Sequence, residues 1–139
     1  MRSAARAAAR GAVVPTLGEI MTKDPFSVAP TATVREVAAA MDKGRVGSAM
    51  VMDGSWLSGI FTERDVLRAA ASGKDLNTAR VSDWMTPDPV TAETGMEAED
   101  AAQVMMSRGF RHLPVVDGST VIGVVSLRDV LSTRVRRPG

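Results

Sequence analysis

Apolar and polar positions recur with two different periods along the chain, and they predict short strands alternating with amphipathic helices. Helical spacing, with apolar residues at i, i+3, i+4 and i+7, occurs at Val34, Val37, Ala38 and Met41. Two short apolar runs, 48–52 and 57–61, flank Asp53-Gly54-Ser55 and predict a β-hairpin with a tight turn. Gly44 is expected to end the helix, because glycine is common just after the last helical turn.

Signals on either side of this pattern predict where further elements begin. Pro25 closes the motif Met21-Thr22-Lys23-Asp24-Pro25, and a residue before proline is driven out of the helical region. We therefore expect an extended backbone at Asp24, followed by a strand at Phe26–Val28. Thr62, with Asp65 three residues later, resembles a helix start that carries an acid in its first turn. A second helix is expected to follow the hairpin there.

The whole pattern occurs twice in the sequence. Residues 21–67 and 85–131 align at a constant offset of 64 without a gap, and 15 of the 47 aligned positions are identical. Such a repeat fixes the architecture before any local assignment is made. The second copy predicts a strand at Val90–Ala92, a helix buried at Ala98, Ala101, Ala102 and Met105, hairpin strands at His112–Val116 and Val121–Val125, and a last helix that starts at Ser126.

Each copy thus has the order strand, helix, strand, strand, helix, which predicts an α+β fold of mixed sheets covered by helices. A unit of 47 residues buries too little surface to be stable alone, so we expect the two copies to share one core. The expected organisation is a flexible Ala/Arg-rich tail at 1–16, repeats at 17–72 and 81–133, a linker at 73–80 and a basic tail at 134–139.

Charge and composition narrow the classes of partner. Six of the 17 basic residues lie in the two tails, which leaves 11 basic and 16 acidic residues in 17–131, a net charge of −5. A nucleic-acid-binding domain shows a basic face instead, so binding through the tails alone is the weaker idea. The chain has no cysteine and no apolar run long enough to span a bilayer, and we expect a cytoplasmic protein. An organelle transit peptide is an alternative interpretation of 1–16, although such peptides are usually longer and rich in serine.

Motifs for catalysis are missing from the sequence. It has one histidine, no cysteine and no tyrosine, and it lacks a glycine-rich phosphate loop, a nucleophile elbow and a pair of spaced histidines. Few groups are left to serve as nucleophile, base and oxyanion donor together. We therefore expect a binding protein with no obligatory cofactor and no metal, and not an enzyme.

Two strand-to-helix junctions carry the candidate binding chemistry. Gly59-x-x-Thr62-x-x-Asp65 and Gly123-x-x-Ser126-x-x-Asp129 each place a hydroxyl and a carboxylate at a helix start. Unpaired backbone N–H groups at such a start attract phosphate, and a nearby carboxylate accepts hydrogen bonds from a ribose diol. The alternative is a plain helix cap, in which the hydroxyl and the acid only satisfy the helix terminus.

Three features resemble the CBS-domain proteins, whose paired repeats form a Bateman module. They are the two Met-Thr-x-x-Pro motifs, the segment Arg111-His112-Leu113-Pro114-Val115-Val116-Asp117, and the two Gly-x-x-Thr/Ser-x-Arg-Asp endings, within 17–131. The resemblance implies two repeats related by a pseudo-two-fold axis, with two clefts between them that bind AMP, ADP, ATP or S-adenosylmethionine and regulate another activity. It also implies a homodimer of such modules.

The resemblance assigns residues to the two clefts unequally. The first cleft would take Thr62, Asp65, Arg111, His112, Pro114 and Arg128, with the Asp on the ribose, the basic residues on phosphate and the proline against adenine. The second, weaker cleft would take Arg45, Ser48, Arg64, Ser126 and Asp129. It is weaker because Gly47, Ser48 and Met50 stand where the other repeat has Arg111, His112 and Pro114.

Two functions remain open at this point. The first is a regulatory module that senses an adenine nucleotide or related adenosyl ligand and acts on its own dimer or on a protein partner. The second is a ligand-free dimeric interaction scaffold, in which Thr62 and Ser126 are only caps.

Overall fold

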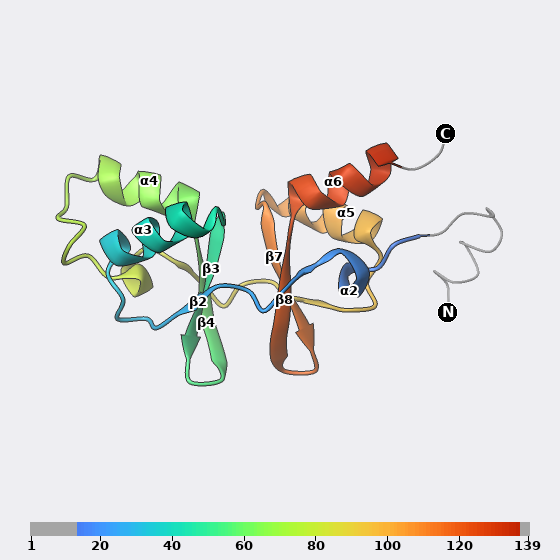
Figure 1. Ribbon diagram of the computed structural model, residues 1–139, viewed down its shortest axis with the longest axis horizontal. Coiled ribbons are helices and arrows are strands. Elements are labelled where there is room, and N and C mark those ends of the chain that lie inside the picture. Colours follow the sequence, from blue (N-terminus) through green and yellow to red (C-terminus); the bar gives the residue numbers. More distant parts are fainter. Residues whose placement is uncertain (1–13, 137–139) are drawn as a thin grey trace. The chain divides into compact units, whose positions relative to one another are not determined.

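The computed structural model of the chain describes residues 14–136, without the side chains of 134–136. Of the expected tails at 1–16 and 134–139, residues 1–13 and 137–139 lie outside this range. The described chain divides into two compact units, one formed by Pro25–Pro89 and the other by 14–24 together with 90–136. The boundaries therefore fall inside the repeats expected from the sequence, and each unit is built from one hairpin and its helices (Figure 1).

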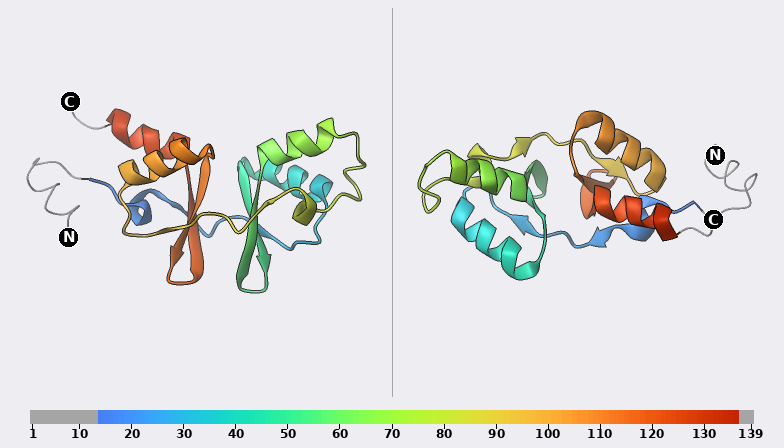
Figure 2. Two further views of the ribbon diagram at one scale, coloured as in Figure 1. Left: turned by 180° about the vertical axis from the view of Figure 1, so that it is seen from behind. Right: turned by 90° about the horizontal axis from the view of Figure 1, so that it is seen from above.

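The unit Pro25–Pro89 holds a mixed four-stranded sheet of order β2-β3-β4-β5. Its elements are β2 (Ser27–Val28), α3 (Val34–Gly44), β3 (Ser48–Asp53), β4 (Trp56–Thr62), α4 (Glu63–Ala71), the 3-10 helix η1 (Val81–Asp83) and β5 (Thr86–Pro87). β2 runs parallel to β3, whereas the other neighbours are antiparallel. The hairpin turn lies at the end of β3 and β4 away from α3 and α4 (Figure 2).

The second unit has the same design, with the sheet order β1-β8-β7-β6. Its elements are α2 (Leu17–Ile20), β1 (Thr22–Lys23), β6 (Ala92–Glu93), α5 (Ala98–Arg108), β7 (His112–Asp117), β8 (Thr120–Ser126) and α6 (Leu127–Arg136). β6 is parallel to β7, and β1 is antiparallel to β8. The α+β fold with mixed sheets is therefore confirmed, and the expected strand at Val90–Ala92 lies slightly later in the chain, at Ala92–Glu93.

The segment that leads into each repeat belongs to the sheet of the other repeat. β1 pairs with β8 through Thr22 and Val124, and β5 pairs with β4 through Thr86 and Ile60. The correspondence extends upstream of the sequence motif. The Leu17 N–H donates to the Met96 carbonyl at 2.9 Å, and the Val81 N–H, 64 residues later, donates to the Ala32 carbonyl at 2.9 Å. Each unit is thus completed by a lead segment, 17–23 or 81–87, with which the opposite repeat begins in the sequence; these two lead segments are exchanged between the units.

Each unit has a hydrophobic core of its own. One contains Leu17 with the inner faces of α5, β7 and β8, and the other contains Val81 with those of α3, β3 and β4. The four positions predicted to face the core from α5, Ala98, Ala101, Ala102 and Met105, are all buried. Leu17 and Val81 are 0% exposed, so the exchanged segments supply the apolar surface that each repeat lacks.

Among residues 14–136, three residues other than glycine adopt left-handed backbone conformations. Asp24 has φ 50° and Asp88 has φ 46°, which corrects the expectation of an extended backbone before proline. Aspartate tolerates this region better than most residues. Asp24 is the last residue of its unit before the chain passes into the unit Pro25–Pro89. The helix α3 includes Gly44, and the left-handed cap follows at Arg45, with φ 56°.

Candidate functional site

The start of α4 forms the capping interaction that the sequence predicts, together with a further contact. The Thr62 N–H donates to Asp65 Oδ2 at 2.9 Å, and the Thr62 hydroxyl donates to the same oxygen at 3.3 Å. The Asp65 side chain is only 8% exposed. A side-chain carboxylate in the first turn of a helix, with these partners, stabilises the helix start and complements the helix dipole.

Arg68 occupies the other oxygen of the same carboxylate. Its Nη1 lies 2.9 Å from Asp65 Oδ1, and the arginine side chain is 53% exposed. The same nitrogen lies 3.4 Å from the Trp84 carbonyl oxygen, and the guanidinium carbon lies 5.5 Å from the centroid of the Trp84 ring. Planar guanidinium groups stack favourably on aromatic faces. Asp65 is therefore held by a side chain that α4 and the segment before β5 position together.

The corresponding junction in the other unit leaves its carboxylate open. Ser126 Oγ accepts a hydrogen bond from the Asp129 N–H at 3.1 Å, so the serine caps α6. The Asp129 side chain is exposed. Among the described side chains, those of residues 14–133, no hydrogen bond or ion pair is found for its carboxylate. Arg111 and His112 lie beside this junction, because His112 pairs with Ser126 and the Arg111 carbonyl accepts from the Leu127 N–H at 2.8 Å.

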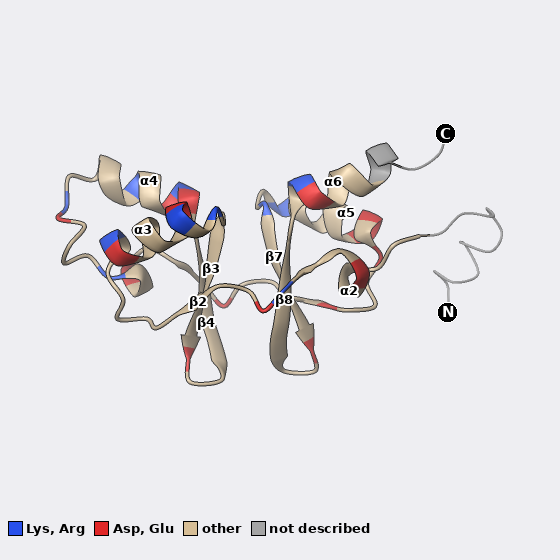
Figure 3. Ribbon diagram, in the orientation of Figure 1, with Lys and Arg blue, Asp and Glu red and all other residues tan. Residues whose placement is uncertain are grey.

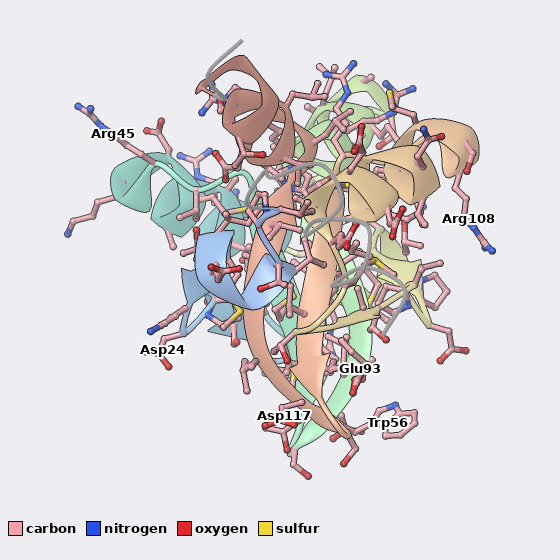
Figure 4. All side chains as sticks on the ribbon, turned by 90° about the vertical axis from the view of Figure 1, so that its right-hand side faces the viewer. Asp24, Arg45, Trp56, Glu93, Arg108 and Asp117 are labelled. Atoms are coloured by element: carbon pink, nitrogen blue, oxygen red, sulfur yellow. The ribbon has the colours of Figure 1, made fainter. Side chains whose placement is uncertain are left out.

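The candidate residues of the first repeat gather around the end of its hairpin. Ser48 is buried and pairs with Thr62, and the Gly47 carbonyl accepts from the Glu63 N–H at 3.1 Å. Arg45 lies at the end of α3, and its side chain points outward (Figure 4). Arg64 is exposed in the first turn of α4, where acidic and basic residues alternate; the first turn of α6 has the same mixture (Figure 3).

Pro114 changes the backbone hydrogen bonding of β7 relative to that of β3 in the first repeat. It is buried in β7 opposite Val124. Its counterpart Met50 donates its backbone N–H to the Phe26 carbonyl at 2.8 Å. Proline has no N–H, so the carbonyl of Val90, which corresponds to Phe26, cannot receive this bond from residue 114. The two repeats therefore differ in backbone hydrogen bonding as well as in charge.

The structure gathers the candidate residues of each unit at one junction of that unit. Each of the two predicted clefts, by contrast, takes its residues from both units. Thr62 and Asp65 belong to Pro25–Pro89, whereas Arg111, His112, Pro114 and Arg128 belong to the other unit. The assignment of these residues to two clefts stays a prediction. Sequence reasoning missed Arg68, although its i, i+3 spacing from Asp65 is the spacing of a helical ion pair. No spacing signal pointed to Trp84, which only the fold brings to α4.

The described part of the chain has neither a cluster of metal-ligating side chains nor a membrane-spanning helix. Across residues 14–136, no three histidine, aspartate or glutamate side chains are grouped so that they could hold a metal ion. In the same range, no helix has the length and apolar character needed to cross a bilayer.

The sequence matches known proteins along most of its length. The family model for the CBS domain matches residues 17–72 and again residues 81–136. The CBS domain-containing protein YhcV of Bacillus subtilis is 36% identical over 113 residues, which are 81% of this chain and 80% of YhcV. This chain therefore belongs to the CBS-domain family and carries two such domains in tandem.

Solved structures of CBS-domain proteins share the fold. The CBS domain structure of NE2398 has a TM-score of 0.83 and 25% identity, and the match covers 88% of this chain and 99% of that one. The CBS domain protein PAE2072 from Pyrobaculum aerophilum, complexed with AMP, has a TM-score of 0.76 and 32% identity over 82% of this chain and 88% of that one. Binding of an adenosyl compound is thus known for a relative of similar length.

Proposed function

We propose that this protein is a regulatory module that binds an adenosyl ligand, AMP, ADP, ATP or S-adenosylmethionine, and acts on its own dimer or on a protein partner. One observation carries the proposal: a hydroxyl and a carboxylate stand at the start of α4 and again at the start of α6, each directly after a hairpin strand. The AMP complex of PAE2072 supports this reading by similarity. The proposed role is non-catalytic and cytoplasmic.

The proposed site combines groups from the two repeats. Asp65 and Thr62 hold the ribose diol, while Arg111, His112 and Arg128 receive the phosphate and Pro114 lies against the adenine. Arginine grips phosphate with two parallel charge-assisted hydrogen bonds, each contributing roughly 1.5 to 3 kcal/mol. Ser126 and Asp129, with Arg45, Ser48 and Arg64, form the weaker site, because Gly47 provides no cation where the other repeat has Arg111.

Signalling in this proposal follows from differential binding. A ligand that contacts two repeats changes their equilibrium only if it binds one arrangement of the chain more tightly than another. The difference in binding free energy between the arrangements then also favours a dimer, or a complex with a protein partner, that requires the same arrangement.

A panel of AMP, ADP, ATP, S-adenosylmethionine and NADH tests the proposal by thermal unfolding of the full chain. A ligand at about 100 times its dissociation constant adds roughly 2.7 kcal/mol of stability, which raises the melting temperature by several degrees. Isothermal titration then gives the stoichiometry. If none of these compounds shifts the transition, the proposal fails.

A ligand-free dimeric scaffold is the second candidate, and the bonds of Asp65 favour it. Both oxygens of this carboxylate already have partners within the repeat, as expected of a structural cap. The scaffold predicts a stable dimer by sedimentation and no response to the panel. The adenosyl module predicts a response whose size depends on Asp65.

A further inference from the structure

We infer that Arg68 determines the ligand affinity of the first repeat, by competing with a ribose diol for the carboxylate of Asp65. A carboxylate has about four acceptor positions on its two oxygens. Three are already used, by the Thr62 N–H at 2.9 Å, by the Thr62 hydroxyl at 3.3 Å and by Arg68 Nη1 at 2.9 Å. A diol that donates two hydrogen bonds therefore needs at least one position that a protein group now holds. This inference rests on the proposed function.

Of the two partners at 2.9 Å, Arg68 is the one that can leave. The Thr62 N–H is fixed at the first turn of α4, whereas the Arg68 side chain is 53% exposed and reaches water by rotating about its own side-chain bonds. The exposed arginine regains hydration when it leaves, and the diol then replaces the hydrogen bond that the carboxylate gives up, so the arginine weakens ligand binding without preventing it. The Trp84 ring, 5.5 Å from the guanidinium carbon, holds the arginine in the competing position.

The second repeat lacks the same competitor. Ser132 stands where the first repeat has Arg68, and its hydroxyl donates to the Arg128 carbonyl at 3.0 Å. Ile20 stands where the first repeat has Trp84. The Asp129 carboxylate, by contrast with Asp65, is exposed. The competition therefore acts on one repeat only, and Ser132 provides a matched control position.

The test compares Arg68→Met with the unchanged chain, using AMP and 2′-deoxy-AMP as probes in isothermal titration. Methionine keeps much of the side-chain length but carries no donor. We expect the dissociation constant for AMP to fall about three- to tenfold, and that for 2′-deoxy-AMP to fall less, because its sugar offers one hydroxyl fewer. Ser132→Ala should leave both constants unchanged.

Arg68→Lys supplies an intermediate case and a second variant if Arg68→Met does not fold. Lysine keeps the charge but lacks the planar group, so the affinity for AMP should lie between the other two. AMP binding that is unchanged or weaker in folded Arg68 variants would overturn the inference while leaving the proposed function standing. If neither chain binds AMP, the inference falls, and the proposed function falls with it only if the other adenosyl compounds also fail to bind.

Discussion

Gly59 of β4 lies directly against Met85, the residue that precedes β5 in the chain. A Cβ atom at position 59 would contact the Met85 sulfur and would lie 2.7 Å from the Thr86 carbonyl oxygen. Gly123 of β8 has the same relation to Met21, with the Thr22 carbonyl oxygen 2.9 Å from the position of a Cβ. The glycine that opens each Gly-x-x-Thr/Ser motif and the methionine of each Met-Thr motif are therefore two sides of one contact.

Substitution of this glycine should destabilise the fold through overpacking. We expect Gly59→Ala to lower the free energy of unfolding by about 1 to 3 kcal/mol, because a close backbone oxygen cannot move aside as a side chain can. Chemical denaturation measures the loss. Gly95→Ala is the control, since nothing lies within 4 Å of a Cβ there. Equal stability of the two variants would contradict the packing role of Gly59.

Replacing Arg45, the left-handed residue after α3, with glycine should stabilise the fold. Arg45 has φ 56°, whereas its counterpart Gly109 has φ 79°. Left-handed backbone costs a residue with a Cβ roughly 1 kcal/mol or more, part of which glycine recovers despite its larger loss of entropy. We expect Arg45→Gly to raise the free energy of unfolding by about 0.5 kcal/mol, and Gly109→Arg to lower it by about 1 kcal/mol. Melting temperatures that move in the opposite directions would refute this.

The exchange of lead segments predicts which fragment folds. A fragment of residues 25–89 contains the complete sheet β2-β3-β4-β5 and its core residue Val81. A fragment of residues 17–72, the first family match, lacks Val81 and β5. We expect cooperative thermal unfolding by circular dichroism for the first fragment and a broad, low-temperature transition for the second. Equal cooperativity in both would show that β5 and η1 contribute little.

The two carboxylates should differ in ligand binding. Asp65→Ala is expected to abolish the tighter adenosyl site, whereas Asp129→Ala should largely spare it, because Arg111 and His112 are assigned to the site of Asp65. Titration with the tightest compound of the panel gives the two constants. Loss of the tighter site in Asp129→Ala alone would reverse the proposed order of the sites.

The start of α2 should show a small acid-dependent loss of stability. Hydrogen bonds from the Thr16 N–H, and then from its hydroxyl, lower the pKa of Glu19 below 4.5. A lowered pKa means that this contribution is present above the ordinary pKa and is lost as the pH falls through the lower, folded value. NMR titration of Thr16→Val should show the pKa of Glu19 moving part of the way back, since the backbone donor remains. An unchanged pKa would mean that the hydroxyl contributes nothing.

Periodicity was sufficient to predict the helices α3 and α5 and the four hairpin strands, because the signal lies within each element, but it did not predict α2, β1, η1 or β5. The spacing of Val34, Val37 and Met41 places all three in the core, and Thr62 with Asp65 forms the expected helix start. The duplication likewise predicted two equivalent sets of strands, and both sheets have the mixed pattern expected from it.

The packing of segments that are distant in the sequence could not be predicted from periodicity. Nothing near Leu17 indicates that it packs with α5 and β7 rather than with the repeat it precedes. The contact of Arg68 with Trp84 also depends on this exchange, since η1 and β5 bring the tryptophan to α4. The left-handed conformation of Asp24 has a similar origin, because the chain changes units there.

The exchanged lead segments also determine how the molecule responds to a single cut in its backbone. The chain passes between the units twice, at Asp24 and Pro25 and again at Pro89 and Val90. A protease that cleaves one crossing leaves the other intact, so neither unit is released by one cut. Complete separation needs both crossings to be cut, and it then leaves one unit as a single peptide and the other as two peptides joined by the pairing of β1 with β8. A half-length product of this duplicated sequence would lack part of its own fold.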